Sequence, residues 1–266
     1  MMHNFRQRYG DWAVVAGAAE GLGAAFSRSL AGWGMNIIMV DKDERKMNES
    51  AKRLKEEFNV EIVKMCLDLS DTKVVNIIFE KITKLGCRFL IFNAAYGPVK
   101  KFLDNTEDEL DYYIDLNSRM PLHLVYRFLK TIPQGKKAGI LLMSSLAGLW
   151  GTQLVVPYGA SKAFDYNLAE GLHYELRDQG IDVMACCAGA TDTPNYRNTK
   201  PIKNLLGPRI MDPMHVAEKT LKNLGKKAVY IPGLSNQLTN FLLTRILPRS
   251  MSATLMNRVM YKMYKS

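Results

Sequence analysis

Short apolar runs alternate with longer amphipathic stretches along most of the chain. The runs are rich in Val, Ile, Leu and Met, a composition typical of strands buried on both faces of a sheet. Regular alternation of such strands with helices predicts an α/β fold, a Rossmann-type doubly wound parallel sheet of about seven strands. The strands are expected at 12–17, 36–40, 60–67, 89–94, 138–145, 181–188 and 228–232, and the helices at 22–34, 44–58, 72–85, 107–131, 157–179 and 213–224.

Local signals predict one helix start, one helix break and the end of the sheet. Thr106 and Glu109 form a capping box that begins the helix over 107–131. Pro121 predicts a kink or a break within that helix, because proline has no amide hydrogen to donate. Beyond the last strand, residues 235–266 are expected to form a basic, methionine-rich extension of two amphipathic helices separated at Pro248. No linker or repeat interrupts the pattern, so a single domain is expected over 1–266.

Composition narrows the class of protein further. The chain has 266 residues, of which 47% are hydrophobic, enough for one large core. The first residues lack the apolar segment of a signal peptide, and no uncharged apolar run reaches about 18 residues, so neither a secretion signal nor a membrane span is expected. The four Cys and four His residues have neither a disulfide framework nor metal-ligand spacing. We therefore expect no metal and a cytoplasmic location.

The positive charge of the chain is concentrated at its C-terminal end. The formal net charge is +10, and nine Lys and Arg residues but no acidic residue follow Glu218. This distribution favours an anionic neighbour, which is a membrane surface, an acidic carrier or a phosphorylated substrate. A solvated basic face is the alternative interpretation. A nucleic-acid partner is not expected, because the sequence has no recognised motif and no basic stripe with interleaved aromatic residues.

A glycine-rich turn follows the first predicted strand. The sequence AGAAEGLGAAF contains Gly17, Gly21 and Gly23 where that strand gives way to a helix. Glycines in this position permit a tight turn and let the backbone and the helix N-terminus approach a pyrophosphate. The turn therefore predicts a dinucleotide site.

The acidic residues near this turn bear on which dinucleotide is bound. Asp41 ends the second predicted strand, where a carboxylate accepts hydrogen bonds from the adenosine ribose and repels a 2′-phosphate. Glu20 inside the glycine turn adds to that repulsion, whereas Lys42 would partly neutralise a phosphate. The pattern favours NAD over NADP. Asp41 is alternatively a helix N-cap, which would not exclude a role at the ribose.

Three polar residues occur at or shortly after the end of the strand predicted over 138–145. Ser145 precedes Tyr158 by thirteen residues, and Lys162 follows Tyr158 by four. Residues four apart share a helix face, so the phenol and the ammonium are expected side by side. Taken alone, this spacing is also that of an ordinary solvated helix face. Ser144 and Ser145 do not lie in a G-x-S-x-G elbow, which argues against a serine hydrolase.

Together these motifs resemble the short-chain dehydrogenase/reductase family over nearly the whole chain. The matching pieces are the glycine turn, LDLSD with Asp68, NAA at 93–95, Asn117, Ser145, Tyr158 with Lys162, and AGATDTP at 188–194. The sequence departs from the family pattern at Ala16, Ala95 and Ala188, which replace a threonine, a glycine and a proline. These changes put fine cofactor geometry in doubt and leave the reactive side chains in place.

The resemblance implies a cofactor site assembled from several segments. Asp68 and Leu69 would border the adenine, and Asn93 and Ala94 would line the cleft. Gly189, Thr191 and Thr193 would lie near the nicotinamide and the diphosphate. With the residues already named, the expected cofactor-binding set is Gly17, Ala19, Glu20, Gly21, Leu22, Gly23, Asp41, Lys42, Asp68, Leu69, Asn93, Ala94, Ala95, Tyr158, Lys162, Gly189, Thr191 and Thr193.

The expected chemistry is hydride transfer between a secondary alcohol and a ketone. A free phenol has a pKa near about 10, too high for a base at neutral pH, and a neighbouring ammonium favours the phenolate. Tyr158 is therefore expected to act as acid and base beside Lys162. Ser145 would orient the substrate oxygen. In the family, the residue matching Asn117 supports a water that relays protons to Lys162, so the expected catalytic set is Tyr158, Lys162, Ser145 and Asn117.

The substrate is expected to be bulky and hydrophobic, because apolar residues dominate the segments that border the site. The N-terminal part is also similar to bacterial hydroxysteroid dehydrogenases, particularly those acting at the 7β position of bile acids. Alternatives are a 3-oxoacyl-thioester reductase and a non-catalytic NAD-binding protein. The expected substrate contacts are Ser145, Ala147, Trp150, Tyr158 and Gly189, within an apolar lining that includes Leu146, Leu149, Leu154, Val155, Val156, Met251, Met256, Met260 and Met263.

The resemblance also implies a homodimer or homotetramer formed through the helices that carry Asn117 and Lys162. The basic extension over 235–266 is expected to contact an anionic membrane peripherally or to pack against a partner subunit.

Overall fold

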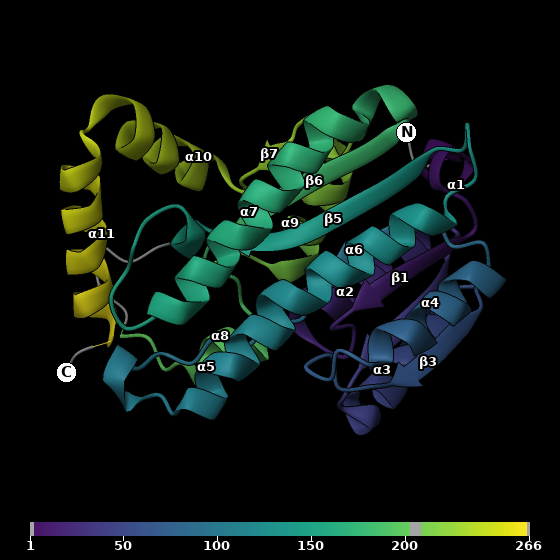
Figure 1. Ribbon diagram of the computed structural model, residues 1–266, viewed down its shortest axis with the longest axis horizontal. Coiled ribbons are helices and arrows are strands. Elements are labelled where there is room, and N and C mark those ends of the chain that lie inside the picture. Colours follow the sequence, from purple (N-terminus) through teal and green to yellow (C-terminus); the bar gives the residue numbers. More distant parts are fainter. Residues whose placement is uncertain (1–2, 203–208, 265–266) are drawn as a thin grey trace.

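The computed structural model describes residues 3–202 and 209–264. Seven parallel strands form one sheet in the order β3-β2-β1-β4-β5-β6-β7, which confirms the doubly wound fold (Figure 1). The single-domain boundary stays a prediction. The strands are β1 (Trp12–Ala16), β2 (Asn36–Asp41), β3 (Ile62–Cys66), β4 (Phe89–Phe92), β5 (Ala138–Ser145), β6 (Ile181–Ala188) and β7 (Val229–Tyr230). The α-helices are α1 (His3–Tyr9), α2 (Gly21–Gly32), α3 (Glu44–Glu57), α4 (Val74–Lys84), α5 (Glu107–Ile114), α6 (Met120–Thr131), α7 (Val156–Leu176), α8 (Pro194–Asn198), α9 (Pro213–Asn223), α10 (Leu234–Phe241) and α11 (Arg249–Tyr264).

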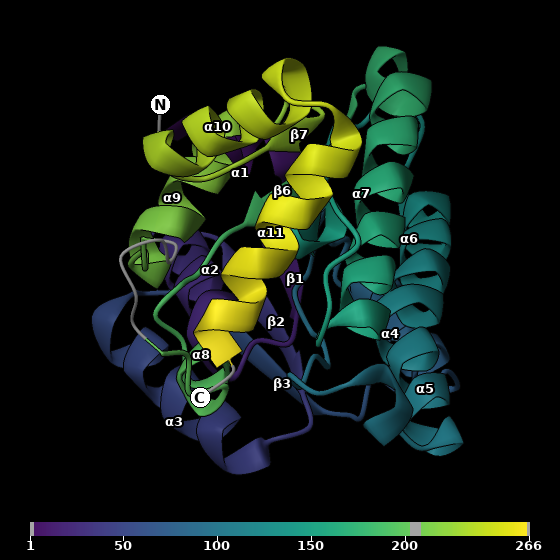
Figure 2. The same cartoon turned by 90° about the vertical axis from the view of Figure 1, so that its left-hand side faces the viewer.

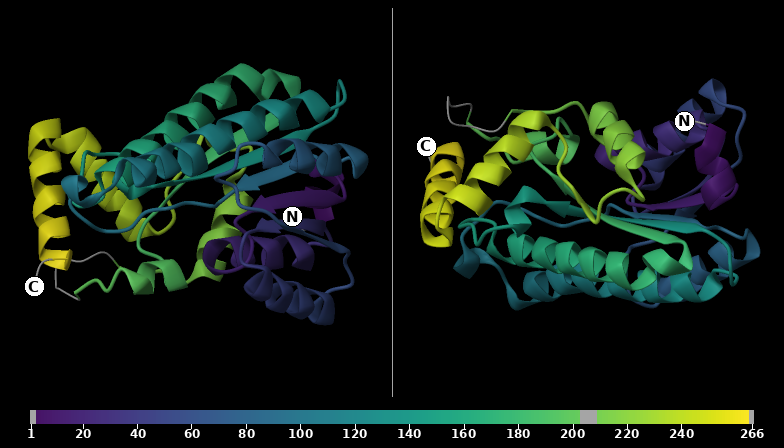
Figure 3. Two further views of the ribbon diagram at one scale, coloured as in Figure 1. Left: turned by 60° about the horizontal axis from the view of Figure 1, so that its bottom comes forward. Right: turned by 90° about the horizontal axis from the view of Figure 1, so that it is seen from above.

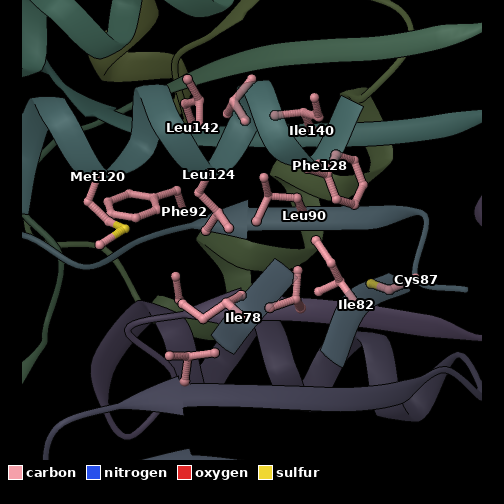
Figure 4. Packing of buried hydrophobic residues seen from close by; sticks show 14 of the residues in the cluster. Ile78, Ile82, Cys87, Leu90, Phe92, Met120, Leu124, Phe128, Ile140 and Leu142 are labelled. Carbon is pink, nitrogen blue, oxygen red and sulfur yellow. The ribbon is translucent and has the colours of Figure 1, made fainter. Parts of the chain in front are cut away.

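Helices cover both faces of the sheet (Figure 3). Side chains along β1 alternate between the faces, as the two-residue period of a strand requires. Val14 and Ala16 pack on the side of α4, α6 and α7, whereas Ala13 and Val15 pack on the side of α1, α2, α3 and α9. Figure 4 shows the first of these layers, in which Leu124 and Phe128 of α6 meet strand side chains such as Leu90. All five β1 residues are buried. A strand buried on both faces needs no alternation of apolar and polar residues, so the continuous apolar run correctly predicted this strand.

The helix predicted over 107–131 is interrupted by a π-helical turn, Asp115–Arg119. The capping box of Thr106 and Glu109 begins α5, as predicted. The expected break near Pro121 is confirmed, but the irregular turn lies just before it, and Pro121 occupies the first turn of α6, where a missing amide hydrogen is tolerated. Wide turns of this kind are frequent at functional sites, and this one carries the buried residue Asn117.

Two short helices lie outside the sequence prediction. Helix α1 has no clear apolar period, but Phe5 contacts the rings of Trp33 and Phe89, so aromatic packing holds it in place. Helix α8 spans only five residues and begins at Thr193, whose hydroxyl accepts a hydrogen bond from the Tyr196 amide. The strand expected at 228–232 is reduced to two residues, since Pro232 cannot donate to a sheet ladder.

The C-terminal extension consists of α10, a π-helical turn (Leu242–Ile246) and α11, with Pro248 between the last two as predicted. Helix α11 crosses in front of the carboxyl ends of the strands (Figure 2). Residues 265–266 of the predicted extension lie outside the described residues. In the described part of the chain, no helix is both long and apolar enough to cross a membrane.

Candidate active site

A cavity of about 1020 Å³ opens at the carboxyl edge of the sheet. Strand order reverses between β1 and β4, and ligands of doubly wound sheets bind in the crevice at such a reversal. The wall of the cavity runs from the glycine turn after β1 to α10 and α11 of the C-terminal extension. The extension therefore forms part of the cavity wall, as the expected apolar lining from its methionines had implied.

The glycine turn brings two backbone segments into close contact. Gly17 has a φ of +82°, and a Cβ added there would lie 2.6 Å from the Ala94 amide nitrogen. A Cβ on Gly23 would lie 1.7 Å from the Gly17 carbonyl oxygen, so only glycine fits at both positions. The side-chain Nδ2 of Asn93 donates to that same carbonyl at 2.8 Å. Gly23 therefore packs behind the turn and is not among the described residues that line the cavity.

The N-terminus of α2 has the features of a phosphate site. Its N-cap residue, Glu20, makes no side-chain hydrogen bond to the helix. Amide groups at an uncapped helix N-terminus donate readily to anions. Gly21 on this turn faces Thr193 across the cavity, where an added Cβ would lie 3.2 Å from the threonine Cβ. These features fit the pyrophosphate of a dinucleotide.

Asp41 is fixed by two backbone amides. Its Oδ2 accepts from the Ala19 amide at 2.9 Å, and its Oδ1 accepts from the Asp43 amide at 3.1 Å. The N-cap of α3 is Asp43, whose carboxylate accepts from the Lys46 amide, so the alternative interpretation of Asp41 as the cap is wrong. Asp41 instead ties the glycine turn to the end of β2, and its carboxylate is half-buried in the cavity wall.

Two lysines flank this carboxylate at the cavity rim. The Lys46 ammonium lies 2.9 Å from the Glu20 carboxylate, and the hydrogen bond to Glu20 raises the pKa of Lys46. The Lys42 ammonium donates to the Tyr112 hydroxyl at 2.9 Å and lies 3.9 Å from Asp68. The rim therefore carries both charges, and its basic groups already have acidic or phenolic partners.

Tyr158 and Lys162 lie one turn apart on α7, and both line the cavity, as does Ser145 at the end of β5. The Lys162 nitrogen is 5.9 Å from the centre of the Tyr158 ring. Gly97 packs on the same ring, since an added Cβ would lie 2.5 Å from Tyr158 Cδ2. The Ser145 hydroxyl accepts from the Ala147 amide at 3.1 Å, which leaves its own proton available to donate.

Lys162 is almost completely buried. Its ammonium donates to the Met143 carbonyl at 2.8 Å and to the Asp165 carboxylate at 2.9 Å. Burial alone would lower the pKa of the Lys162 ammonium, but the charge of Asp165 raises it. Nothing in the sequence pattern singled out Asp165, which falls on the inner face of a helix whose other signals were Tyr158 and Lys162.

Asn117 supports the site from behind the cavity wall. Its side-chain amide donates to the Tyr96 carbonyl at 2.7 Å and to the Ser161 hydroxyl at 3.0 Å, and its carbonyl oxygen accepts from the Tyr96 amide at 2.8 Å. Asn117 thus joins the segment after β4 to α7. It is fully buried and is not among the described residues that line the cavity.

The substrate half of the cavity lies between the segment after β5 and the C-terminal extension. Trp150 and Val155 line it from the first side, and Met256, Met260 and Met263 line it from α11. The other predicted lining residues differ: Leu149, Leu154, Val156 and Met251 are not among the described residues in this wall. Val156 and Met251 are instead exposed. Met251 lies off the face of α11 that meets the cavity, which repeats as 256, 260 and 263.

Helix α11 is attached to both sides of the cavity. Asn257 accepts from the Gln153 amide at 2.8 Å and donates to the Gly151 carbonyl at 3.0 Å. Near its other end, the Met263 carbonyl accepts from the Ile202 amide at 2.8 Å. No sequence pattern predicts this bridge, because a lone asparagine in an amphipathic helix has no distinguishing spacing.

The structure brings together nearly all of the predicted site. Every residue of the expected cofactor-binding set except Gly23, and every expected substrate contact, lines this cavity, whereas Leu149, Leu154, Val156 and Met251 of the expected apolar lining are not among its described residues. The residues that sequence reasoning missed include Gly97 and Asp165, which contact Tyr158 and Lys162, and Asn257, which fastens α11 to the segment after β5. Within residues 3–202 and 209–264, no group of three His, Cys, Asp or Glu side chains is arranged to hold a metal ion.

The chain is similar to known proteins in both sequence and fold. The family model for short chain dehydrogenases matches residues 11–204. A 7β-hydroxysteroid dehydrogenase of Clostridium sardiniense is 28% identical over 234 residues, which cover 88% of this chain and 90% of that protein. A solved structure from work on 7β-hydroxysteroid dehydrogenase stereoselectivity has a TM-score of 0.85 at 25% identity and covers 94% of this chain and 98% of the other.

A second group of relatives differs in the named activity. A very-long-chain 3-oxoacyl-CoA reductase of Neurospora crassa is 33% identical over 180 residues, which cover 65% of this chain and 54% of that protein. The match to this relative therefore leaves a larger part of both chains uncovered than the match to the Clostridium sardiniense protein does.

Proposed function

This chain belongs to the short-chain dehydrogenase family of nicotinamide-dependent oxidoreductases, and on that premise we propose that it interconverts a bulky, hydrophobic secondary alcohol and its ketone with NAD(H). The observation that carries the proposal is a single cavity lined by the glycine turn, by Tyr158 and Ser145, and by the apolar face of α11. A nicotinamide cofactor and an apolar substrate need such a shared space, because the hydride passes directly between them.

The proposed mechanism assigns proton transfer to Tyr158. In the direction of oxidation, its phenolate takes the proton of the substrate hydroxyl, and in reduction its hydroxyl returns that proton. The bound cofactor accepts or supplies the hydride. The Ser145 hydroxyl donates a hydrogen bond to the substrate oxygen, and the Lys162 ammonium favours the phenolate. Asn117 holds the backbone at Tyr96 against α7, and the water relay implied by the resemblance stays a prediction.

We propose NAD rather than NADP as the cofactor. The support is the fixed carboxylate of Asp41, which two backbone amides hold in the cavity wall. A 2′-phosphate placed there would meet a negative charge that cannot easily turn away. Lys42 and Lys46 oppose this argument, but both have partners at the rim. We expect kcat/KM with NAD to exceed that with NADP by about tenfold or more, which corresponds to about 1.4 kcal/mol.

For the substrate we propose a hydroxysteroid of the bile acid type. The support is the similarity to 7β-hydroxysteroid dehydrogenases over most of both chains, together with a cavity wall rich in Met and Trp that suits a rigid apolar ring system. The test is a panel of bile acids, other steroids, 3-oxoacyl thioesters and simple alcohols, each assayed with NAD and with NADP. Turnover of simple alcohols alone would contradict the proposed substrate class.

Two alternatives are separated by the same panel. A 3-oxoacyl-thioester reductase is favoured by the relative from Neurospora crassa, and preferential turnover of the thioesters would support it. A non-catalytic NAD-binding protein would bind NADH tightly but turn over none of the panel. That outcome is disfavoured by the joint presence of Ser145, Tyr158 and Lys162 in one cavity.

We propose that the outer face of α10 contacts an anionic membrane peripherally. Leu238, Phe241 and Ile246 are more than half exposed along this face, and the neighbouring Arg245 and Arg249 make no ion pair with any described residue. An interface between two copies would set these basic groups against each other with no acidic residue after Glu218 to compensate them. Anionic lipid headgroups supply the missing charge.

Vesicle flotation tests this contact. We expect the protein to bind phosphatidylcholine vesicles that contain phosphatidylserine at low salt, and a Leu238→Gln/Phe241→Gln variant to bind them much less. Vesicles of phosphatidylcholine alone are the control. Absence of binding at low salt would reject the proposal, and a dimer dissociated by the same substitutions would identify a second copy as the occupant.

The proposed homodimer or homotetramer uses a different surface. Helices α6 and α7 lie side by side on the same face of the sheet (Figure 2). Leu122 and Tyr126 of α6 and Phe164 and Tyr174 of α7 are exposed. Sedimentation velocity on the wild type and on a Tyr126→Lys variant tests this interface, and an unchanged mass for the variant would argue against it. The cytoplasmic location stays a prediction.

A further inference from the structure

We propose that Asp165 is a positioning residue for the reaction, whose buried carboxylate keeps the Lys162 ammonium charged and in place beside Tyr158. Asp165 lies three residues after Lys162 on α7 and is outside the cavity wall as far as the chain is described. It therefore acts on the chemistry only through Lys162. This inference rests on the proposed role of Tyr158 and extends it by one residue.

The geometry of the pair is that of a buried ion pair. The Lys162 nitrogen and Asp165 Oδ2 are 2.9 Å apart, and the two side chains are only 2% and 1% exposed. The same nitrogen donates to the Met143 carbonyl, which fixes the direction of the ammonium. The second carboxylate oxygen of Asp165, Oδ1, is buried and has no hydrogen-bond partner. Asp165 therefore has no role in capping or in the backbone, and Lys162 is its one partner among the described side chains.

Burial makes this pairing necessary for a charged lysine. An isolated ammonium in an apolar interior is so unfavourable that the group releases its proton instead. Burial lowers the pKa of the Lys162 ammonium, and Asp165 opposes that effect and raises it. The carboxyl pKa of Asp165 is raised by burial and lowered by Lys162, so each member of the pair sustains the charge of the other.

Other groups packed around α7 do not replace this carboxylate. On α7 itself the second titratable neighbour of the ammonium is Tyr158. From β6, Cys187, which lies beside Ser144, is a neutral thiol, because burial raises its pKa to about 12. From α5, burial likewise raises the pKa of Tyr113. The adjoining part of β5 and the short helix Leu146–Gly148 carry no titratable side chain, and in the π-helical turn Asp115 and Arg119 pair with each other.

The consequence is a specific change in the pH profile. With Asp165→Asn, the effect of burial on Lys162 is no longer opposed by a carboxylate. The ammonium then releases its proton at a lower pH than in the wild type, and the phenolate of Tyr158 loses the cation that favours it. Alcohol oxidation then begins at higher pH. We expect kcat/KM at pH 7 to fall by about tenfold for each unit by which the kinetic pKa rises. The ratio of wild type to variant should shrink toward pH 10, where the phenolate forms without help.

The control variant is Glu170→Gln, which removes another acid of α7 that only accepts a hydrogen bond from Tyr166. It should keep the wild-type profile. A purely structural role for Asp165 would reduce activity by the same factor at every pH, and that result would overturn the proposal. A profile shifted to lower pH would also overturn it, because it would mean that Asp165 weakens the effect of Lys162.

A second measurement needs no turnover and covers the case in which Asp165→Asn folds poorly. In denaturant unfolding, Asp165→Leu and Lys162→Met should each destabilise the protein, because each leaves one buried charge unpaired. The double variant should unfold at a higher denaturant concentration than either single variant. Additive losses would overturn the pairing. If this coupling holds while no substrate is turned over, the proposed function fails and the ion pair stands.

Discussion

Two glycines shape the candidate site through the side chains that they lack. Gly17 lets the backbone after β1 approach Ala94, and Gly97 lets the Tyr158 ring lie against the segment after β4. Of these, only Gly17 has a positive φ, so Gly97 is required for space and not for backbone conformation. Substitution of the two glycines by alanine should therefore have different effects.

Gly17→Ala should impair folding and cofactor binding together. The left-handed backbone costs a non-glycine residue about 1–3 kcal/mol, and the contact with Ala94 adds to that. We expect a loss of that size in the free energy of unfolding and at least about tenfold weaker NADH binding. The control is Gly86→Ala, where φ is +59° but no atom lies within 4 Å of an added Cβ. Equal effects of the two substitutions would contradict the close approach.

Gly97→Ala should separate catalysis from binding. A methyl group there displaces the Tyr158 ring, and a displacement of about 1 Å at a reacting group can cost about 100-fold in rate. We therefore expect kcat to fall by up to that factor while the NADH dissociation constant changes little. Gly151→Ala, which has open space around its Cβ, is the control. An unchanged kcat in Gly97→Ala would show that the ring is not held by this contact.

Site residues could be predicted from the sequence where they belong to a motif of fixed spacing. Tyr158, Lys162 and Ser145 line one cavity as expected, and Asp41 lies at its rim. Gly97 and Asp165 were missed because their roles depend on contacts that no local pattern encodes. Gly97 meets Tyr158 only after β4 and α7 pack together, and Asp165 resembles any other acidic residue of a helix until its burial is known.

Among the elements, α11 has the largest effect on the substrate half of the site. Its apolar face closes one side of the cavity, and its hydrogen bonds reach the segment after β5. The sequence predicted two amphipathic helices here, which is correct, but it did not predict where they dock. Likewise, Pro121 signalled a break, whereas the position of the π-helical turn is set by the bonds of Asn117 to Tyr96 and Ser161. Both outcomes depend on distant segments.

Asn257→Ala should loosen this cover. It removes the two side-chain hydrogen bonds of Asn257, from the Gln153 backbone amide and to the Gly151 carbonyl, each worth about 1 kcal/mol. We expect the KM for a bulky substrate to rise several-fold, about fivefold for 1 kcal/mol, with a smaller change in kcat. Asn223→Ala removes a bond within α9 far from this wall and should leave KM unchanged. If KM is the same in both variants, α11 does not depend on Asn257 for its position.

The ion pair between Lys100 and Glu109 should make stability depend on acid pH. The hydrogen bond from Lys100 lowers the pKa of Glu109 from its usual 4.5 to about 2. A carboxyl whose pKa is lowered on folding stabilises the protein above pH 4.5, and this contribution is lost as the pH falls toward 2. Wild type should therefore exceed Glu109→Gln in unfolding free energy at pH 6, and the difference should shrink below pH 4.5. The exposed Glu107→Gln is the control, and a difference independent of pH would contradict the pair.

Across the whole molecule, the early and the late strands of the chain carry different parts of the cavity. The segments after β1, β2 and β3, together with Thr193 after β6, form the part of the cavity that fits a dinucleotide. The segment after β5 and the C-terminal extension form the apolar part. The fold class followed from the alternation of strands and helices, because a parallel sheet has few other arrangements. The nature of the substrate did not follow, since it depends on how the extension closes the cavity.

The central claim is that Tyr158 transfers the proton in an NAD-dependent oxidation of a hydrophobic secondary alcohol. The most direct test is the rate of NADH formation from a 7β-hydroxy bile acid by the wild type and by Tyr158→Phe, with NADH binding measured on both proteins. We predict turnover by the wild type, a loss of about 100- to 10,000-fold in the variant, and similar NADH affinity in the two. Turnover retained by Tyr158→Phe would contradict the claim.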